Sequence, residues 1–260
     1  MKKKFKKLIA LTMAITCFAS LAITSTATFN GVDDKQYIPT LDEQLERVMA
    51  DDIIDSEMKE SIIEKIMISM NPETARSASG NTIMSRSSNT LAVPYFNQEF
   101  DHYCGPATVK QTVHFFNGFS WSQADIARSI GTTPVGSDIN NMITYIFNST
   151  SNHYIIKWLT SNPAVTEMRN LMVEGIDYWG MPPIPCIKIS AINISAGLRY
   201  ITDGHVLNVS GYNFSNTSNR RYEVTDPFGK GHGVANGKYE INETALLNSI
   251  VAHKDRFFAW

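Results

Sequence analysis

The order of the hydrophobic patterns constrains the fold of this 260-residue chain more than any other feature. Between residues 104 and 178 apolar residues recur at helical spacing, whereas after Pro185 short segments alternate or run apolar between turn residues. The expected helices follow Cys104, Ser120 or Ser122, Asp138 and Ala164; the expected strands are 185–190, 205–212, 221–226 and 237–241. Helices followed by an antiparallel sheet predict an α+β domain over residues 91–260.

The segment before this domain differs in composition. Residues 28–90 carry 12 acidic and 6 basic residues, with two amphipathic stretches between 33 and 76 and a Ser/Asn-rich linker over 77–90. One interpretation is a helical spacer or a hairpin packed on the domain. The other is a pro-segment that covers the cleft until it is cut.

The first 27 residues predict a secretion signal. Five lysines precede an apolar stretch from Leu8 to Ile23, and small residues up to Ala27 offer a cleavage point. The alternative is an N-terminal membrane anchor, because the apolar run is only slightly shorter than a span. Cleavage leaves 18 basic against 25 acidic residues, a charge near −7. We therefore expect a secreted protein with no stable membrane insertion, and no binding to nucleic acid. Its oligomeric state is left open.

Gln98 and Cys104 suit a cysteine nucleophile. Gly105 and Pro106 follow the cysteine at the start of a predicted helix, and a helix N-terminus lowers a thiol pKa because its free N–H groups favour negative charge. The Gln98 amide, six residues upstream, is placed to donate to a tetrahedral oxyanion beside the Cys104 N–H. A buried, inert cysteine is the alternative for Cys104 taken alone.

His205 and Asp226 supply a base and its orienting acid. His205 begins a predicted strand after Gly204, and the next strand ends at Asp226. Two antiparallel strands joined by a hairpin bring the start of one beside the end of the other, so Asp226 can hold the His205 ring.

Several residues compete for these roles. His102 is very near Cys104, His114 lies within the helix, and His232 is on a glycine-flanked loop. Asp203 competes with Asp226 but is close to His205 along the strand. Cys186 lies in an apolar strand and reads as a buried thiol, although a disulfide with Cys104 stays open. Neither H-E-x-x-H nor paired-cysteine spacing occurs, so we expect no metal and no cofactor.

Four stretches together resemble the C39-like peptidases, a bacterial branch of the papain-like cysteine peptidases. They are residues 93–98, 103–107, 203–206 and 224–227. The resemblance implies a papain-like fold, with the nucleophile helix in an N-terminal helical lobe and the base on a C-terminal antiparallel sheet. It also implies that Cys104 is the nucleophile, Gln98 the oxyanion donor, His205 the base and Asp226 the orienting acid.

The family resemblance implies a peptide or protein substrate. C39 peptidases attached to transporters cut leader peptides after paired glycines, whereas this chain shows a secretion signal and no transporter segment. We therefore expect an exported, stand-alone cysteine peptidase. The same residues also suit an amide or acyl transferase, or a binding module that keeps the fold without turnover.

Overall fold

The computed structural model describes residues 41–50, 56–70, 86–190, 200–229 and 235–260, and these fall in one compact unit. The predicted signal, residues 1–27, lies outside the described residues, as do parts of the 28–90 segment. Within the described ranges no helix combines the length and the apolar character needed to cross a bilayer.

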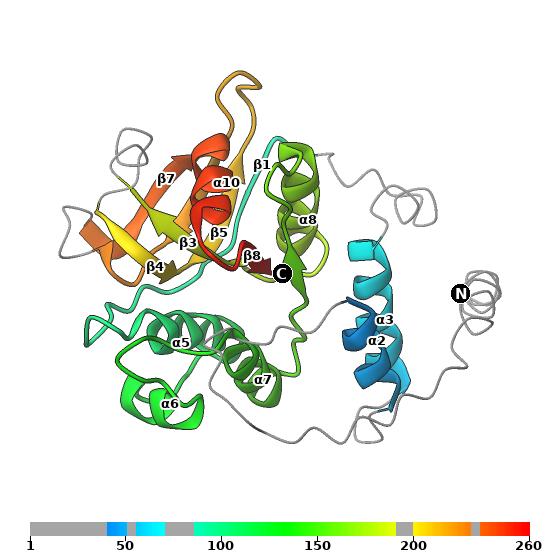
Figure 1. Ribbon diagram of the computed structural model, residues 1–260, viewed down its shortest axis with the longest axis vertical. Helices are drawn as coiled ribbons and strands as arrows, with labels where there is room; N and C mark the ends of the chain where they lie inside the picture. The colour runs from blue at the N-terminus through cyan, green and yellow to red at the C-terminus, as the bar shows by residue number, and fades with distance from the viewer. Residues whose placement is uncertain (1–40, 51–55, 71–85, 191–199, 230–234) are drawn as a thin grey trace. The chain divides into compact units, whose positions relative to one another are not determined.

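Four helices follow one another after the first strand, as the sequence predicts. They are α5 (Cys104–Asn117), α6 (Gln123–Ser129), α7 (Ile139–Thr150) and α8 (Val165–Asp177). Local signals set their ends. Ser122 and Asp138 accept backbone N–H bonds as N-caps of α6 and α7, and Gly118 ends α5 in the left-handed conformation. Figure 1 shows α5, α6 and α7 grouped together, and α5 contacts strands β4 and β5.

The strands form two four-stranded sheets rather than the one sheet expected. The first has the order β1-β5-β6-β7 and the second β2-β8-β3-β4, and all recorded pairs are antiparallel. Their bounds are β1 (Ser88–Thr90), β2 (Ile156–Trp158), β3 (Ile184–Ile189), β4 (Thr202–Val206), β5 (Asn208–Asn213), β6 (Arg221–Thr225), β7 (Lys238–Asn242) and β8 (Phe257–Ala259). The α+β class is confirmed.

The single strand predicted over 205–212 is wrong, because the chain changes sheets at Leu207. β4 pairs with β3, whereas β5 pairs with β6 and β1. The Leu207 side chain is fully buried at this junction. The sequence carries no turn signal at this position, and only the pairing partners determine the break.

Three short strands and one helix were not predicted. β1, β2 and β8 have three residues each, too few for a period-two pattern, and β1 falls in the stretch interpreted as linker. Helix α10 (Glu243–Ala252) is capped by Asn242, and its wide buried face includes the polar residues Glu243 and Ser249, so its apolar stripe is indistinct.

Two further helices precede the domain, α2 (Leu41–Ala50) and α3 (Ser56–Met70). Val48, Ile62 and Ile66 pack with Ile155 in a small apolar cluster. Lys65 of α3 is also buried, and its Nζ lies 3.1 Å from the His153 carbonyl oxygen. Helices α2 and α3 therefore pack against the residues of the domain that directly precede β2.

Candidate active site

Cys104 is the first residue of α5. The Tyr103 side chain makes no capping hydrogen bond, so backbone N–H groups of the first turn remain available to an anion. Burial by itself raises the pKa of the Cys104 thiol. A hydrogen bond to His205, the charge of that ring, and the backbone N–H groups of Val206 and Gly105 outweigh burial and bring the pKa below its usual value.

His205 lies on β4 and is almost fully buried. Its Nε2 is 2.9 Å from Asp226 Oδ1, and its side chain also bonds the Cys104 thiol. Since the carboxylate holds Nε2, Nδ1 is the nitrogen left to face sulfur. Burial lowers the pKa of His205, but the Asp226 charge and hydrogen bond, together with Cys104, raise it to about 10. The two shifts favour a thiolate beside an imidazolium.

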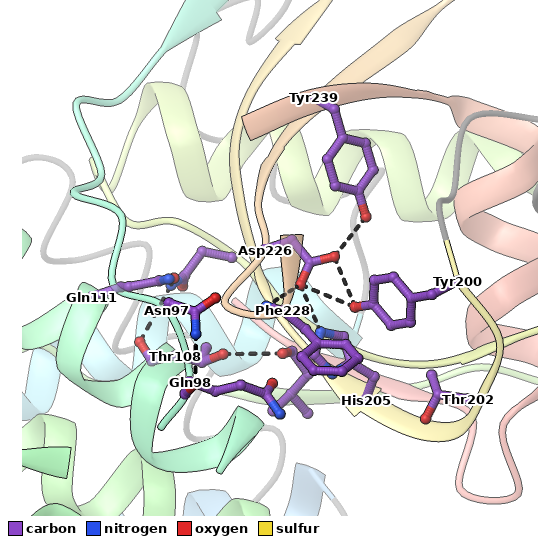
Figure 2. A network of polar contacts seen from close by, with 12 residues as sticks. Asn97, Gln98, Thr108, Gln111, Tyr200, Thr202, His205, Asp226, Phe228 and Tyr239 are labelled. Carbon is purple, nitrogen blue, oxygen red and sulfur yellow. Dashed lines mark hydrogen bonds and ion pairs between the residues drawn. The ribbon is translucent and has the colours of Figure 1, made fainter. Parts of the chain in front are cut away.

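Asp226 directly follows β6 and is completely buried. Its carboxylate accepts bonds from the Tyr200 hydroxyl at 2.8 and 3.0 Å, the Tyr239 hydroxyl at 2.7 Å and the Phe228 N–H at 2.8 Å. Burial raises the pKa of Asp226, but the His205 charge and these donors bring it below its usual value. Figure 2 shows these groups converging on the carboxylate. Asp226 therefore stays ionised and fixed in orientation.

Sequence reasoning missed Tyr200 and Tyr239. Tyr239 lies in a predicted strand, but nothing in the pattern indicates that its hydroxyl reaches Asp226. Tyr200 also meets the His205 ring edge-on, with centroids 5.5 Å apart and planes at 87°. Burial, followed by the Asp226 charge, raises the pKa of Tyr200 far above its usual value, so the phenol remains a donor. Contacts of this kind join segments distant in sequence and leave no local signal.

Gln98 lies close to these groups but its amide is occupied. The side chain is buried, and Nε2 donates to the carbonyl oxygens of Phe100 at 3.0 Å and Asp101 at 2.9 Å. Oε1 is a buried acceptor without a partner among the described residues. The Gln98 N–H donates to Pro227 O, which ties this loop to the residue after Asp226. Donation to an oxyanion therefore requires the amide to turn away from the two carbonyls.

The competing residues lie elsewhere or bond other groups. His102 stacks with Phe100, and His114 Nδ1 lies 3.3 Å from the Ser120 hydroxyl. Asp203 is exposed and pairs with Lys188 at 2.7 Å. His232 lies outside the described residues. The structure thus brings Cys104, His205 and Asp226 together, whereas the described competitors bond other partners.

A second cysteine–histidine pair lies nearby, but its chemistry differs. Cys186 and Cys104 are both free, and Cys186 Sγ is 3.4 Å from His253 Nε2. Burial raises the pKa of Cys186 and lowers the pKa of His253. Because His253 Nδ1 accepts the Asp255 N–H, the ring is a neutral donor rather than an imidazolium. Cys186 is therefore an unreactive thiol.

A thiol at a helix start, facing an imidazole and a carboxylate carried by strands, is the arrangement of papain-like cysteine peptidases. The chain belongs to the Peptidase_C39 like family, whose family model matches residues 90–249. The predicted family is thereby confirmed. Among curated proteins, none matches the chain in sequence.

Several solved structures are similar to this one. The proform of the Amb a 11 cysteine protease, a ragweed pollen allergen, has a TM-score of 0.46 at 10% identity, over 67% of this chain and 64% of its own, so less than two thirds of that protein is spanned. Xylellain, a cysteine protease from Xylella fastidiosa, has a TM-score of 0.45 at 10% identity over 67% and 85%. Bromelain protease from Ananas comosus has a TM-score of 0.45 at 13% identity over 68% and 98%.

Proposed function

We propose that this protein is a secreted cysteine peptidase that hydrolyses peptide bonds through Cys104, His205 and Asp226. The observation that carries the proposal is the continuous chain from the Cys104 thiol through His205 to the buried Asp226 carboxylate. That chain lowers the pKa of the thiol and raises the pKa of the imidazole. Both changes favour a nucleophile that is ionised before substrate arrives.

The reaction begins with the proton of Cys104 on His205 Nδ1. The Cys104 thiolate attacks the carbonyl carbon of a peptide bond and forms a tetrahedral oxyanion. As the C–N bond breaks, His205 gives its proton to the departing amine, leaving a thioester on Cys104. His205 then takes a proton from the water that attacks the thioester, and the tetrahedral intermediate collapses to release the carboxylic acid and restore the Cys104 thiolate beside protonated His205. Asp226 holds the imidazole orientation and stabilises its charge throughout.

The oxyanion needs donors near Cys104. The Cys104 N–H, at the start of α5, is one, and Gln98 is proposed as the second once its amide turns from the Phe100 and Asp101 carbonyls. The oxyanion that forms when the thiolate attacks a substrate carbonyl offers the amide a charged acceptor in exchange for two neutral ones. Charge-assisted bonds are about twice as strong as neutral ones, so the exchange is close to balanced.

Acyl transfer is the second candidate, because an amine acceptor in place of water uses the same residues. The predicted signal over 1–27 supports export, and N-terminal sequencing of the exported protein tests cleavage after Ala27. The inhibitory role of 28–90 is a separate proposal, tested by comparing activity with and without that segment.

The decisive experiment profiles cleavage of a peptide library by the purified protein. We expect Cys104→Ala to abolish hydrolysis, whereas Cys186→Ala, its buried counterpart, keeps it within about twofold. Mass spectrometry of the products with and without an added amine separates hydrolysis from acyl transfer. If Cys104→Ala still hydrolyses peptides, the assignment of Cys104 as the nucleophile is wrong. If the wild-type protein cuts no peptide and its Cys104 reacts like a free thiol, the result supports a binding module.

A further inference from the structure

A cluster of buried polar side chains joins the helix that carries Cys104 to the strands that carry His205. Its members are Thr108, Gln111 and Thr112 on α5 and Asn208 at the start of β5, all without solvent exposure. Buried polar groups are retained in a core when their hydrogen bonds are made, and they then fix the packing of the elements that carry them. This cluster therefore sets how α5 lies on the strands.

The bonds within the cluster cross from the helix to the strands. Asn208 Nδ2 donates to Gln111 Oε1 at 3.0 Å and to the Thr108 carbonyl at 3.3 Å. The Thr112 hydroxyl lies 2.9 Å from Asn208 Oδ1 and 3.0 Å from the Thr108 carbonyl, which share its hydrogen. These contacts satisfy the Asn208 side chain, and Gln111 continues the connection to the Phe96 carbonyl at 3.1 Å.

Thr108 makes a contact of a different kind, with the backbone of the catalytic strand. Its hydroxyl donates to the Val206 carbonyl at 3.0 Å, and Val206 is the residue after His205 (Figure 2). The N–H of Val206 meanwhile reaches the Cys104 sulfur. The N–H and C=O of one strand residue point to the same side, so Val206 contacts α5 at two points. Those points, Cys104 and Thr108, are one helical turn apart on the same face.

We propose that Thr108 is a positioning residue, which fixes the register of β4 against α5 and so holds the His205 ring against the Cys104 thiol. The inference rests on the proposed function, since it assigns Thr108 to the alignment of the same nucleophile and base. One hydroxyl suffices because the Val206 carbonyl and N–H flank a single residue that the β3–β4 ladder holds opposite Cys186. When the carbonyl loses its donor, strand and helix are free to slide by a few tenths of an ångström, and the thiol–imidazole bond lengthens.

The test is the pH dependence of iodoacetamide alkylation at Cys104, read by mass spectrometry of the Cys104 peptide so that Cys186 does not interfere. The substitution Thr108→Val keeps the shape and removes the hydroxyl. We expect the apparent thiol pKa to rise by about one unit, which slows alkylation about tenfold at pH values below the wild-type midpoint and leaves the rate unchanged well above both midpoints. Alkylation needs no substrate, so the readout does not depend on turnover.

Two further variants separate positioning from stability. Thr112→Val removes an equally buried hydroxyl on the same helix that does not touch β4, and we expect it to lower the melting temperature without moving the thiol pKa. Thr108→Ser retains the hydroxyl and should keep the wild-type profile, including where Thr108→Val does not fold.

Each remaining outcome counts against the proposal. A wild-type profile in folded Thr108→Val overturns the positioning role alone. A Thr108→Ser profile shifted as far as that of Thr108→Val assigns the effect to packing and also overturns it. A wild-type Cys104 that titrates like a free thiol overturns both this inference and the proposed function.

Discussion

Replacing Asp226 by asparagine removes the charge that keeps His205 protonated while it preserves shape. In the wild-type protein the Asp226 carboxylate accepts from His205, Tyr200, Tyr239 and the Phe228 N–H. An asparagine oxygen can still accept, but its amide group donates and carries no charge. The burial of His205 is then opposed only by the neighbouring Cys104.

The size of the effect follows from the site. The rise in the pKa of His205 from 6.5 to about 10 corresponds to about 5 kcal/mol. Unit charges 2.9 Å apart attract by about 6 kcal/mol at an effective dielectric constant of about 20, so Asp226 accounts for a shift of this size. We therefore expect the pKa of His205 in Asp226→Asn to fall well below its wild-type value, because burial lowers it and only the contribution of Cys104 still raises it.

The sign of the pH dependence is fixed by the raised pKa. His205 contributes its full stabilisation below pH 6.5 and loses it as the pH rises through about 10. The free energy of unfolding of Asp226→Asn should therefore fall furthest below wild type between about pH 4 and 6.5, where wild-type Asp226 is ionised and His205 is protonated, with the difference closing toward pH 10 and again in stronger acid. At pH 7 the thiolate–imidazolium pair of the variant should be weakened, and alkylation of its Cys104 should be slower than in wild type.

Two assays report these changes. Titration of the His205 ring by NMR gives its pKa directly, and denaturant unfolding at several pH values gives the stability difference. Asp203→Asn is the matched control, because Asp203 is exposed and pairs with Lys188. If Asp226→Asn folds and its His205 still titrates near 10, the carboxylate does not hold the ring charge and the reasoning fails.

Three further predictions concern Gly105, Gln98 and Lys65. A Cβ at position 105 would come within 2.3 Å of Ser137 Oγ, so Gly105→Ala should displace the start of α5 and slow Cys104 alkylation at pH 6. An unchanged alkylation rate would mean that the Ser137 side chain moves aside without displacing the helix. Gln98→Ala should lower kcat about a hundredfold and leave the pH profile of Cys104 alkylation unchanged. If kcat and the alkylation rate fall equally, Gln98 acts on the reactivity of the Cys104 thiol and does not stabilise the oxyanion. Burial lowers the pKa of Lys65 to about 7, against a smaller opposing effect of Glu174. Lys65 should therefore contribute less to stability as the pH drops from 10.5 to 7, so the melting temperature of Lys65→Met should rise relative to wild type over that range, and the difference should then level off.

The part of the fold that could be predicted is the part with local signals. The helices after Ser122 and Asp138 are predictable from their capping side chains, and the helix at Cys104 is predictable from Pro106, Gly118 and the apolar spacing between them. The break at Leu207 and the short strand β8 were not, because each is defined by a partner far along the chain. Strand pairing is non-local, and a short segment carries too few residues to indicate its partner.

The sequence likewise predicts some features of the candidate site and not others. Cys104 and Gln98 were selected by spacing, and His205 and Asp226 by the expectation that a hairpin brings strand ends together. Their catalytic roles stay predictions, although the structure places His205 and Asp226 2.9 Å apart. The orientation of the Gln98 amide depends on carbonyls in a loop, which no sequence pattern specifies.

The position of α2 and α3 bears on the two interpretations of the segment before the domain. Lys65 lies 5.1–5.5 Å from the ring centroids of Tyr154, Trp179 and Trp260, which gather beside β2 and at the end of β8. The sheet order β2-β8-β3-β4 puts β2 and the His205 strand at opposite edges, about 14 Å apart at the usual spacing of strands. Residues held at the β2 edge by a buried lysine brace the sheet at the edge opposite the His205 strand. This favours the interpretation of α2 and α3 as helices packed on the domain over the interpretation of these helices as a cover for the active site.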